Sequence, residues 1–187
     1  NPVVGDLKGN AKKILFVASK ASSISADVVL TPELSLWGYP ANDLLLKKTL
    51  IQNQYQILDQ LALDINKKYG NLSITVGMAE IINDSFFPNL YNSIALLEGG
   101  KWNIIARKII LPTYEVFDEK RYFRSEEKVS ILIKKIKNKT WRLGFSICED
   151  LWVNEDIEGR GIHKKNPIID LKKKKVDILI NLSASPY

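Results

Sequence analysis

Three short apolar runs, each followed at once by a polar cluster, constrain the fold of this 187-residue chain most strongly. The runs cover residues 27–31, 141–147 and 176–182, and the clusters that follow read TPELS, CEDLW and SASPY. Apolar runs of this length are typical of strands that are buried on both faces of a sheet. Stretches with helical periodicity separate them, so the pattern indicates an α/β protein.

Chemically useful residues stand where these three strands are expected to end. Glu33 comes two residues after the first run, Cys148 directly after the second, and Ser183 directly after the third. Because ligands in α/β folds gather outside the carboxyl ends of strands, we expect these residues to converge on one crevice. Cys148 is the only cysteine of the chain, which excludes an internal disulfide and suits a reducing compartment.

Hydrophobic periodicity and turn residues predict the remaining elements. The long, charged and aromatic-rich segment 113–128 has weak periodicity and is typical of a functional loop. We expect Asn10 to cap the first helix and Asn42 or Asp43 to start the second. The predicted helices cover residues 9–23, 42–69 and 168–175. The predicted strands cover residues 27–31, 72–82, 90–98, 101–110, 130–137, 140–147 and 176–182.

The net charge of +6 comes mostly from lysine, with dense patches at residues 133–139 and 171–177. These lysines lack interleaved arginines and aromatics, which favours solvated helix ends over a nucleic-acid surface.

The chain has a single histidine, His163, which excludes a multi-histidine metal site and fits an exposed loop. No apolar run approaches the roughly 20 residues of a membrane-spanning helix, and the first residues do not read as a signal peptide. We therefore expect a cytoplasmic protein that uses neither membrane nor nucleic acid.

Hydrolysis of an amide by a thiol needs a nucleophile, a base, a stabiliser for the oxyanion and an acid for the leaving amine. Cys148 is the candidate nucleophile. With the one histidine assigned to a loop, the base is expected to be a carboxylate, and Glu33 is the candidate. Lys108 lies near the end of a predicted strand, where an ammonium group would lower a thiol pKa and stabilise an oxyanion. Each residue has an ordinary structural alternative when it is considered alone, since lone buried cysteines are usually structural.

Four longer phrases make the assignment more specific. TPELSLWGYPANDLLL, ARKIILPTYEVFDEKRYF, LGFSICEDLW and LINLSASPY occur in this order along the chain. Together they resemble the nitrilase, or carbon–nitrogen hydrolase, superfamily. Within it they are most similar to the glutaminase domains of glutamine-dependent NAD synthetases, and GYPANDLL, VFDEKRYF and SASPY are the most specific parts. The resemblance covers nearly the whole chain and implies a nitrilase-type α-β-β-α sandwich.

The resemblance also implies roles for the residues that match the family motifs. Glu33 matches the general base, Lys108 the lysine that stabilises the oxyanion, and Cys148 the nucleophile. Many superfamily members have a second glutamate that orients the lysine. Glu119 is our choice for this residue, with Glu115 as the alternative.

Further positions match the family's substrate contacts. Tyr39 and Tyr114 match residues that line the glutamine pocket. Glu149, Ser183 and Ser185 match positions expected to hold the α-amino and α-carboxyl groups of the substrate. The backbone N–H of Glu149 is also expected to contribute to oxyanion stabilisation. Packing or loop capping is the alternative reading of these five residues.

The implied reaction releases ammonia from L-glutamine through a cysteine thioester. The ammonia then serves the ATP-dependent amidation of deamido-NAD by a synthetase domain that this sequence does not contain. The hydrolysis needs no metal and no cofactor, whereas ATP and Mg²⁺ are expected in the synthetase domain. Family domains open with a strand before the phrase NPVVGD and continue past SASPY, so residues 1–187 are expected to form a partial domain, incomplete at both ends, and a homo-oligomer is expected.

Two other functions stay open at this point. One is a stand-alone amidase of the nitrilase family, such as an ω-amidase or a carbamoylase. The other is a non-catalytic fragment or scaffold, against which the joint presence of Glu33, Lys108 and Cys148 speaks.

Overall fold

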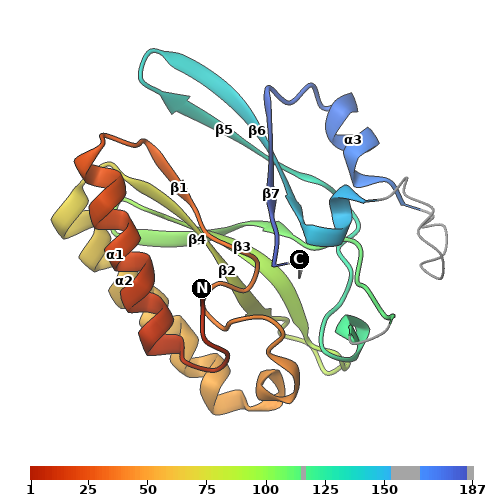
Figure 1. Ribbon diagram of the computed structural model, residues 1–187. Coiled ribbons are helices and arrows are strands. Elements are labelled where there is room, and N and C mark those ends of the chain that lie inside the picture. The colour runs from red at the N-terminus through yellow and green to blue at the C-terminus, as the bar shows by residue number, and fades with distance from the viewer. Residues whose placement is uncertain (115–116, 153–164, 185–187) are drawn as a thin grey trace. The chain divides into compact units, whose positions relative to one another are not determined.

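The computed structural model describes residues 1–114, 117–152 and 165–184, drawn as a ribbon in Figure 1. The chain divides into two units, one of residues 1–79 and 93–104, the other of residues 80–92 and the described part of 105–187. The elements are α1 (Leu7–Ser23), β1 (Val28–Leu30), η1 (Asn42–Leu46), α2 (Lys48–Tyr69), β2 (Ser73–Ile81), β3 (Leu90–Glu98), β4 (Lys101–Arg107), η2 (Glu119–Arg121), β5 (Ser130–Ile136), β6 (Lys139–Ile147), η3 (Cys148–Leu151), α3 (Pro167–Lys173) and β7 (Ile178–Leu182), where η marks a 3₁₀-helix.

The strands form two sheets, one with the order β1-β2-β3-β4 and one with the order β5-β6-β7. β1 pairs with β2 in parallel, and β6 pairs with β5 antiparallel and with β7 in parallel. Mixed helix and sheet content in two sheets confirms the expected α/β class. None of the helices among the described residues has both the length and the apolar character that crossing a bilayer requires.

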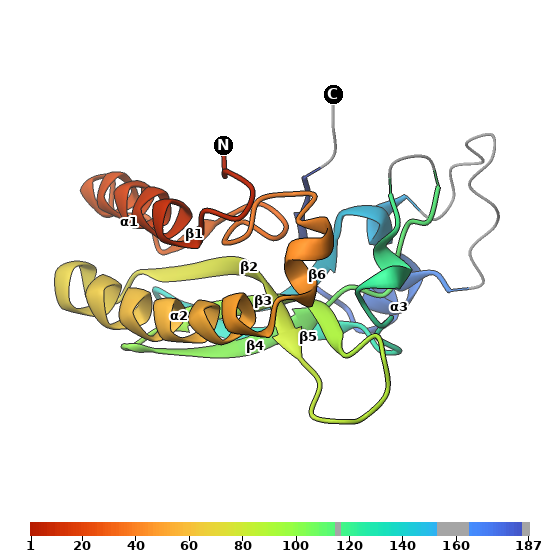
Figure 2. The ribbon, with the colours of Figure 1, turned by 90° about the horizontal axis from the view of Figure 1, so that it is seen from below.

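In the first unit α1 and α2 pack against each other, as Figure 2 shows. Both are amphipathic, because their buried apolar residues recur at helical spacing. On α1 these include Ile14, Ala18 and Ala21, and on α2 they include Leu58 and Ile65. The apolar faces that the sequence predicted for the two helices are therefore the faces that form the core of this unit.

Asn10 does not cap α1, contrary to the prediction. Asp6 is the cap, and its side chain accepts a hydrogen bond from the backbone N–H of Gly9. The Asn10 side chain is buried and bonds both backbone groups of Val3, at 2.8 Å each, and the carbonyl of Leu36 at 3.0 Å. An amide can satisfy a donor and an acceptor at once, so Asn10 fixes the residues before the helix instead of its first turn.

The long helix predicted to start at Asn42 or Asp43 is interrupted. A 3₁₀-helix ends at Leu46, and Lys47 has an extended backbone with φ −84° and ψ 97° before α2 begins. The carbonyl of Lys47 then accepts from the N–H groups of Leu50 and Ile51, so it starts the α-helix. The apolar periodicity is continuous across this break, which is why the sequence pattern concealed it.

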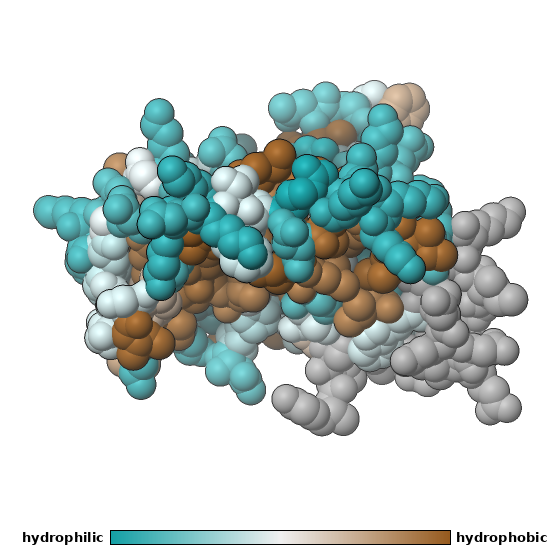
Figure 3. Space-filling model, turned by 90° about the horizontal axis from the view of Figure 1, so that it is seen from above, coloured by the Kyte–Doolittle hydropathy of each residue, from teal (hydrophilic) through white to brown (hydrophobic). Residues whose placement is uncertain are grey.

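The expected burial of three strands on both faces is correct for β6 and wrong for β1 and β7. Leu30 in β1 is 49% exposed, and Ile178 and Leu179 in β7 are 40% and 39% exposed. Among the described residues each of these strands pairs on one side only, so their side chains have fewer neighbours than those of a central strand. Figure 3 shows hydrophobic surface lying open among hydrophilic atoms on the face that it draws.

In the second unit β6 is the central strand and ends at the predicted nucleophile. Its last five residues are buried, and η3 begins directly after them at Cys148. Parallel register pairs Ile147 of β6 with Leu182 of β7. Cys148 and Ser183 therefore follow paired residues, which confirms that these two strand ends meet.

Candidate active site

Lys108 is a fully buried lysine immediately after β4. None of its surface is exposed, and its Nζ lies 2.8 Å from Oε1 of Glu119, which is also buried. The backbone of Lys108 is held on both sides, because its N–H donates to the carbonyl of Asn92 at 2.8 Å and its carbonyl accepts from the N–H of Glu126 at 3.0 Å. Residues 117–128 thus bring Glu119 to the lysine side chain and Glu126 to its backbone.

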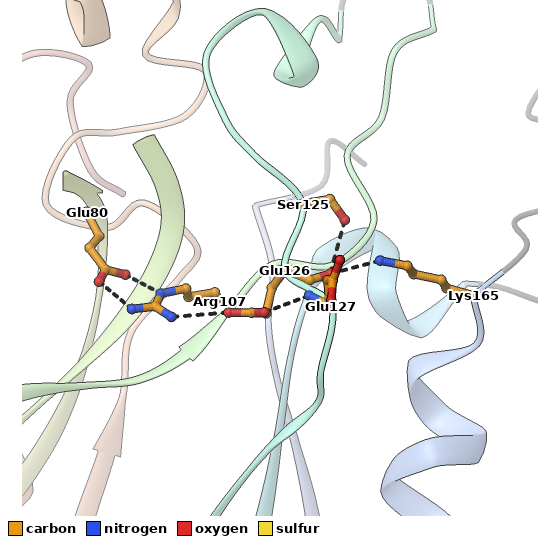
Figure 4. Close-up of polar contacts among 6 residues, drawn as sticks. All are labelled: Glu80, Arg107, Ser125, Glu126, Glu127 and Lys165. Atoms are coloured by element: carbon orange, nitrogen blue, oxygen red, sulfur yellow. Dashed lines mark hydrogen bonds and ion pairs between the residues drawn. The ribbon is translucent and has the colours of Figure 1, made fainter. Parts of the chain in front are cut away.

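The residue before this lysine, Arg107, is the centre of an ion-pair network (Figure 4). Its guanidinium donates two hydrogen bonds of 2.6 Å to Glu80 and one of 3.1 Å to Glu126. The bonds to Glu80 raise the pKa of Arg107 above its ordinary value. Nζ of Lys165 also reaches the carbonyl of Glu126 at 3.3 Å. This network ties the end of β4 to β2 and to residues 125–127, so it fixes the backbone that presents Lys108.

Cys148 lies at the turn from β6 into η3. Its φ of +45° is in the left-handed region, which few residues other than glycine adopt without strain. The residue is 8% exposed. Asn181 of β7 donates to Oγ of Ser146 at 2.9 Å and to the Cys148 carbonyl at 3.4 Å, so the neighbouring strand holds the turn.

Glu149 and Tyr114, two predicted substrate contacts, bind each other. The Tyr114 hydroxyl donates to Oε2 of Glu149 at 2.9 Å, and Glu149 is buried. The ring of Tyr114 also makes an edge contact with Phe117, with centroids 5.5 Å apart. Ser183 follows β7 and is exposed. The predicted residues Ser185 and Glu115, as well as His163, lie outside the described residues.

Glu33 belongs to the first unit, where it is buried in the turn after β1. Ser35 stabilises this turn, because its Oγ lies 2.6 Å from Oγ1 of Thr31 and accepts from the N–H of Gly77 at 3.0 Å. A Cβ at Gly77 would lie 2.3 Å from the backbone N of Leu34, so only glycine lets the turn lie this close to β2.

The rest of the predicted loop in this unit is anchored through buried polar groups. Nε1 of Trp37 donates to Oε1 of Gln54 on α2 at 2.6 Å, and the Gln54 amide bonds the N–H and the carbonyl of Ala79 at 3.0 and 2.6 Å. Tyr39, the predicted pocket residue, follows at the end of this loop and is half-buried. Fully satisfied buried networks of this kind fix a loop in one conformation.

Asp150 is the residue in this region that the sequence pattern did not single out. It is 1% exposed, and its carboxylate accepts hydrogen bonds from the N–H groups of Ile109, Ile110 and Ile147. Burial raises the pKa of Asp150 to about 6, against the opposing effects of these bonds and of the charge on Lys108. Within the described ranges, no group of three or more histidine, cysteine and acidic side chains is placed to hold a metal ion.

Comparison with known proteins shows the family to which the chain belongs. The family model described as carbon–nitrogen hydrolase matches residues 1–187. The glutamine-dependent NAD(+) synthetase of Synechocystis is 39% identical over the whole chain, and that of Thermotoga maritima is 35% identical. The chain spans only 33% and 29%, respectively, of the length of these two relatives.

Solved structures extend the comparison to the fold. A glutamine-dependent NAD+ synthetase from Acinetobacter baumannii, solved with ADP, superposes with a TM-score of 0.81 at 31% identity, covering all of this chain and 31% of that one. An amidase from Nesterenkonia, in a form with acrylamide added to its active-site cysteine, superposes with a TM-score of 0.63 at 19% identity. It covers 81% of this chain and 55% of the amidase, and at this identity it supports the nitrilase fold alone.

Proposed function

The chain belongs to the carbon–nitrogen hydrolase family, and we propose that it is the glutamine-hydrolysing part of a glutamine-dependent NAD synthetase. The observation that carries the proposal is the buried ion pair of Lys108 and Glu119 at 2.8 Å. Burying an ammonium group is costly even when it is paired, and apolar residues would fill the same space at lower cost. A lysine in this position is well suited to stabilise a developing negative charge in a site shielded from water.

In the proposed acylation step, Glu33 removes the proton of the Cys148 thiol, and the thiolate attacks the carboxamide carbon of glutamine. The carbonyl oxygen becomes an oxyanion that Lys108 and the backbone N–H of Glu149 stabilise. Glu119 keeps the Lys108 ammonium in place. The C–N bond then breaks, Glu33 returns its proton to the departing ammonia, and a thioester forms between Cys148 and the γ-glutamyl group.

In the proposed deacylation step, Glu33 takes a proton from a water molecule, which attacks the thioester carbon. The C–S bond breaks, Glu33 returns the proton to the Cys148 sulfur, and glutamate leaves. Tyr39, Tyr114, Glu149, Ser183 and Ser185 are the proposed contacts of the substrate. The Tyr114–Glu149 hydrogen bond supports a joint role, because it holds the Glu149 carboxylate in one position. An anionic carboxylate there suits the α-amino group of glutamine.

The hydrolysis itself uses no cofactor in this proposal. ATP and Mg²⁺ serve the synthetase reaction, which takes the ammonia and amidates deamido-NAD. A cytoplasmic location and a homo-oligomeric assembly belong to the same proposal. Light scattering of the full-length protein during size-exclusion chromatography tests the assembly.

The decisive experiment is to treat the full-length protein with a diazo-ketone analogue of glutamine and to map the adduct by mass spectrometry. We expect one adduct, at Cys148, with loss of glutamine-dependent NAD synthesis and retention of ammonia-dependent synthesis. An adduct at Cys148 in a protein that hydrolyses other amides and makes no NAD would favour a stand-alone amidase. A folded protein that forms no adduct would favour a scaffold and contradict the proposal.

A further inference from the structure

Asp150 is a buried carboxylate to which the proposed reaction gives no role. It stands two residues after Cys148, in the 3₁₀-helix that follows the candidate nucleophile. Only 1% of it is exposed. A carboxylate in such a place has either a structural role or a role in positioning its neighbours, and its contacts separate the two.

Both carboxylate oxygens of Asp150 are used, and they reach two different segments. Oδ2 accepts from the N–H of Ile147, the residue before the nucleophile, at 3.0 Å. Oδ1 accepts from the N–H groups of Ile109 and Ile110, at 3.1 and 2.7 Å. These two residues directly follow Lys108. One side chain thus joins the residue before Cys148 to the residues after Lys108.

The turn that Asp150 holds is a strained one. Cys148 has a φ of +45°, and such a conformation persists only where the surroundings determine it. Asp150 fixes the backbone on the N-terminal side of Cys148. The Asn181 side-chain amide donates a hydrogen bond to the carbonyl of Cys148. A shift of either strand end would release the turn and move the sulfur relative to Lys108.

We propose that Asp150 is a positioning residue that locks the Cys148 turn to the Lys108 segment through three backbone hydrogen bonds. This inference rests on the proposed function, because it concerns the alignment of a nucleophile with the group that stabilises its oxyanion. Hydrogen bonds from backbone N–H groups to a carboxylate are strong and directional, which suits a fixed alignment.

The energetic setting of Asp150 supports this role. Burial raises its pKa to about 6, so the desolvation of the carboxylate outweighs the three N–H bonds and the attraction of Lys108. An ionised group in this place works against folding at neutral pH. Its presence is explained if it supplies an alignment that an apolar side chain cannot give.

The test is Asp150→Asn in the full-length protein. Asparagine keeps the size and shape of the side chain, but its amide nitrogen cannot accept a hydrogen bond, so at least one of the three N–H groups loses its partner. We expect the rate of Cys148 acylation by glutamine to fall by about 10- to 100-fold. The KM for glutamine should change by less than about threefold, and ammonia-dependent NAD synthesis should be unaffected.

Asp170→Asn is the matched control, because Asp170 is an exposed carboxylate on α3 in the same unit. It should leave acylation unchanged.

A second readout is independent of glutamine. It is the rate at which iodoacetamide labels Cys148 as a function of pH, measured on the peptide that contains Cys148 by mass spectrometry. In Asp150→Asn, loss of the carboxylate charge alone would shift the profile to lower pH. A shift to higher pH is expected if the thiol is displaced from the positive charge of Lys108, which favours the thiolate.

Iodoacetamide could label Cys148 in an unaltered protein that does not hydrolyse glutamine. The proposed function would then fail, while the pH profile of labelling would still test the positioning role of Asp150. A folded Asp150→Asn protein with a normal acylation rate and a normal profile overturns the inference. Should this variant not fold, Asp150→Glu keeps the charge and displaces the oxygens by one methylene. Wild-type acylation in that variant overturns the inference, and failure of both variants to fold assigns Asp150 to stability alone and also overturns it.

Discussion

The ammonium group of Lys108 lies 2.8 Å from Oε1 of Glu119, and both side chains are buried in the second unit. Each charge stabilises the other in a place where water cannot. Removal of either partner would break this ion pair inside the protein. Lys108 is therefore tied to stability as well as to the proposed chemistry, and an experiment has to separate the two effects.

Lys108→Met should slow acylation of Cys148 by about 100- to 1,000-fold, which is the usual effect of losing one group that stabilises an oxyanion. It should also lower the free energy of unfolding by about 3 kcal/mol, because a buried ion pair is broken. Single-turnover kinetics with glutamine measures the first effect, and denaturant unfolding measures the second.

The double variant Lys108→Met, Glu119→Gln is the control for this prediction. It removes both charges, so it should recover most of the lost stability and none of the lost rate. A double variant that regains acylation would show that the lysine acted only through folding.

Cys148→Ala should abolish glutamine-dependent NAD synthesis in the full-length protein and leave ammonia-dependent synthesis intact. The thiol is removed, while the synthetase reaction needs only ammonia. Parallel assays with glutamine and with ammonium chloride measure the two activities. Glutamine-dependent synthesis that survives in this variant would place the nucleophile elsewhere.

The position of Cys148 at a strand end could be predicted from the sequence, because an apolar run ends there and polar residues follow. Asp150 could not. In the sequence it is the second of two acids after a cysteine, indistinguishable in kind from Glu149. What separates them is the direction of three backbone N–H groups, two of them from a segment about 40 residues away. Only the folded backbone reveals that relation.

The boundaries of the elements and the exposure of their side chains could also be predicted only in part. Periodicity located α2 but not its true start, because the apolar face continues through the extended residue Lys47. The apolar sequence of β7 predicted that this strand is buried, yet the side chains of Ile178 and Leu179 are exposed. An apolar run reports what a strand is able to bury, whereas its actual neighbours depend on the order of strands in the sheet.

Gly77→Ala should displace the turn that carries Glu33. The added Cβ would lie 2.3 Å from the N of Leu34, 2.7 Å from the carbonyl oxygen of Pro32 and 2.9 Å from the carbonyl carbon of Glu33, all of them backbone atoms. We expect a loss of about 1–3 kcal/mol in unfolding free energy. Acylation should slow by about tenfold or more, since misplacement of a base by even 1 Å is costly.

Gly99→Asn is the matched control for this substitution. A Cβ at Gly99 meets no atom within 4 Å, and asparagine tolerates its φ of +58°. Thermal unfolding and single-turnover acylation of the two variants give the comparison. Equal effects at both glycines would mean that close approach to β2 does not determine the position of the turn.

The stability contribution of Asp150 should depend on pH with a defined sign. The folded protein raises its pKa from an ordinary value of 3.8 to about 6, with burial as the main cause. Below pH 3.8 the carboxyl is protonated in both states, and its contribution to stability is largest. As the pH rises through 6 the unfolded state already has the ionised form, while the folded state has to bury it, so the contribution is lost. The positive charge of Lys108, which is paired with Glu119, acts on Asp150 and opposes the upward shift of its pKa.

The expected measurement is therefore a difference between the unaltered protein and Asp150→Asn, taken from unfolding free energies at several pH values. Relative to the variant, the unaltered protein should lose about 2 kcal/mol between pH 4 and pH 7, as the change in pKa implies. Asp170→Asn should give a flat difference over the same range, because that carboxylate is exposed. A difference for Asp150 that grows in favour of the unaltered protein as the pH rises would mean that its three N–H bonds outweigh its desolvation. The carboxylate would then be a stabilising group, and its retention would need no functional explanation.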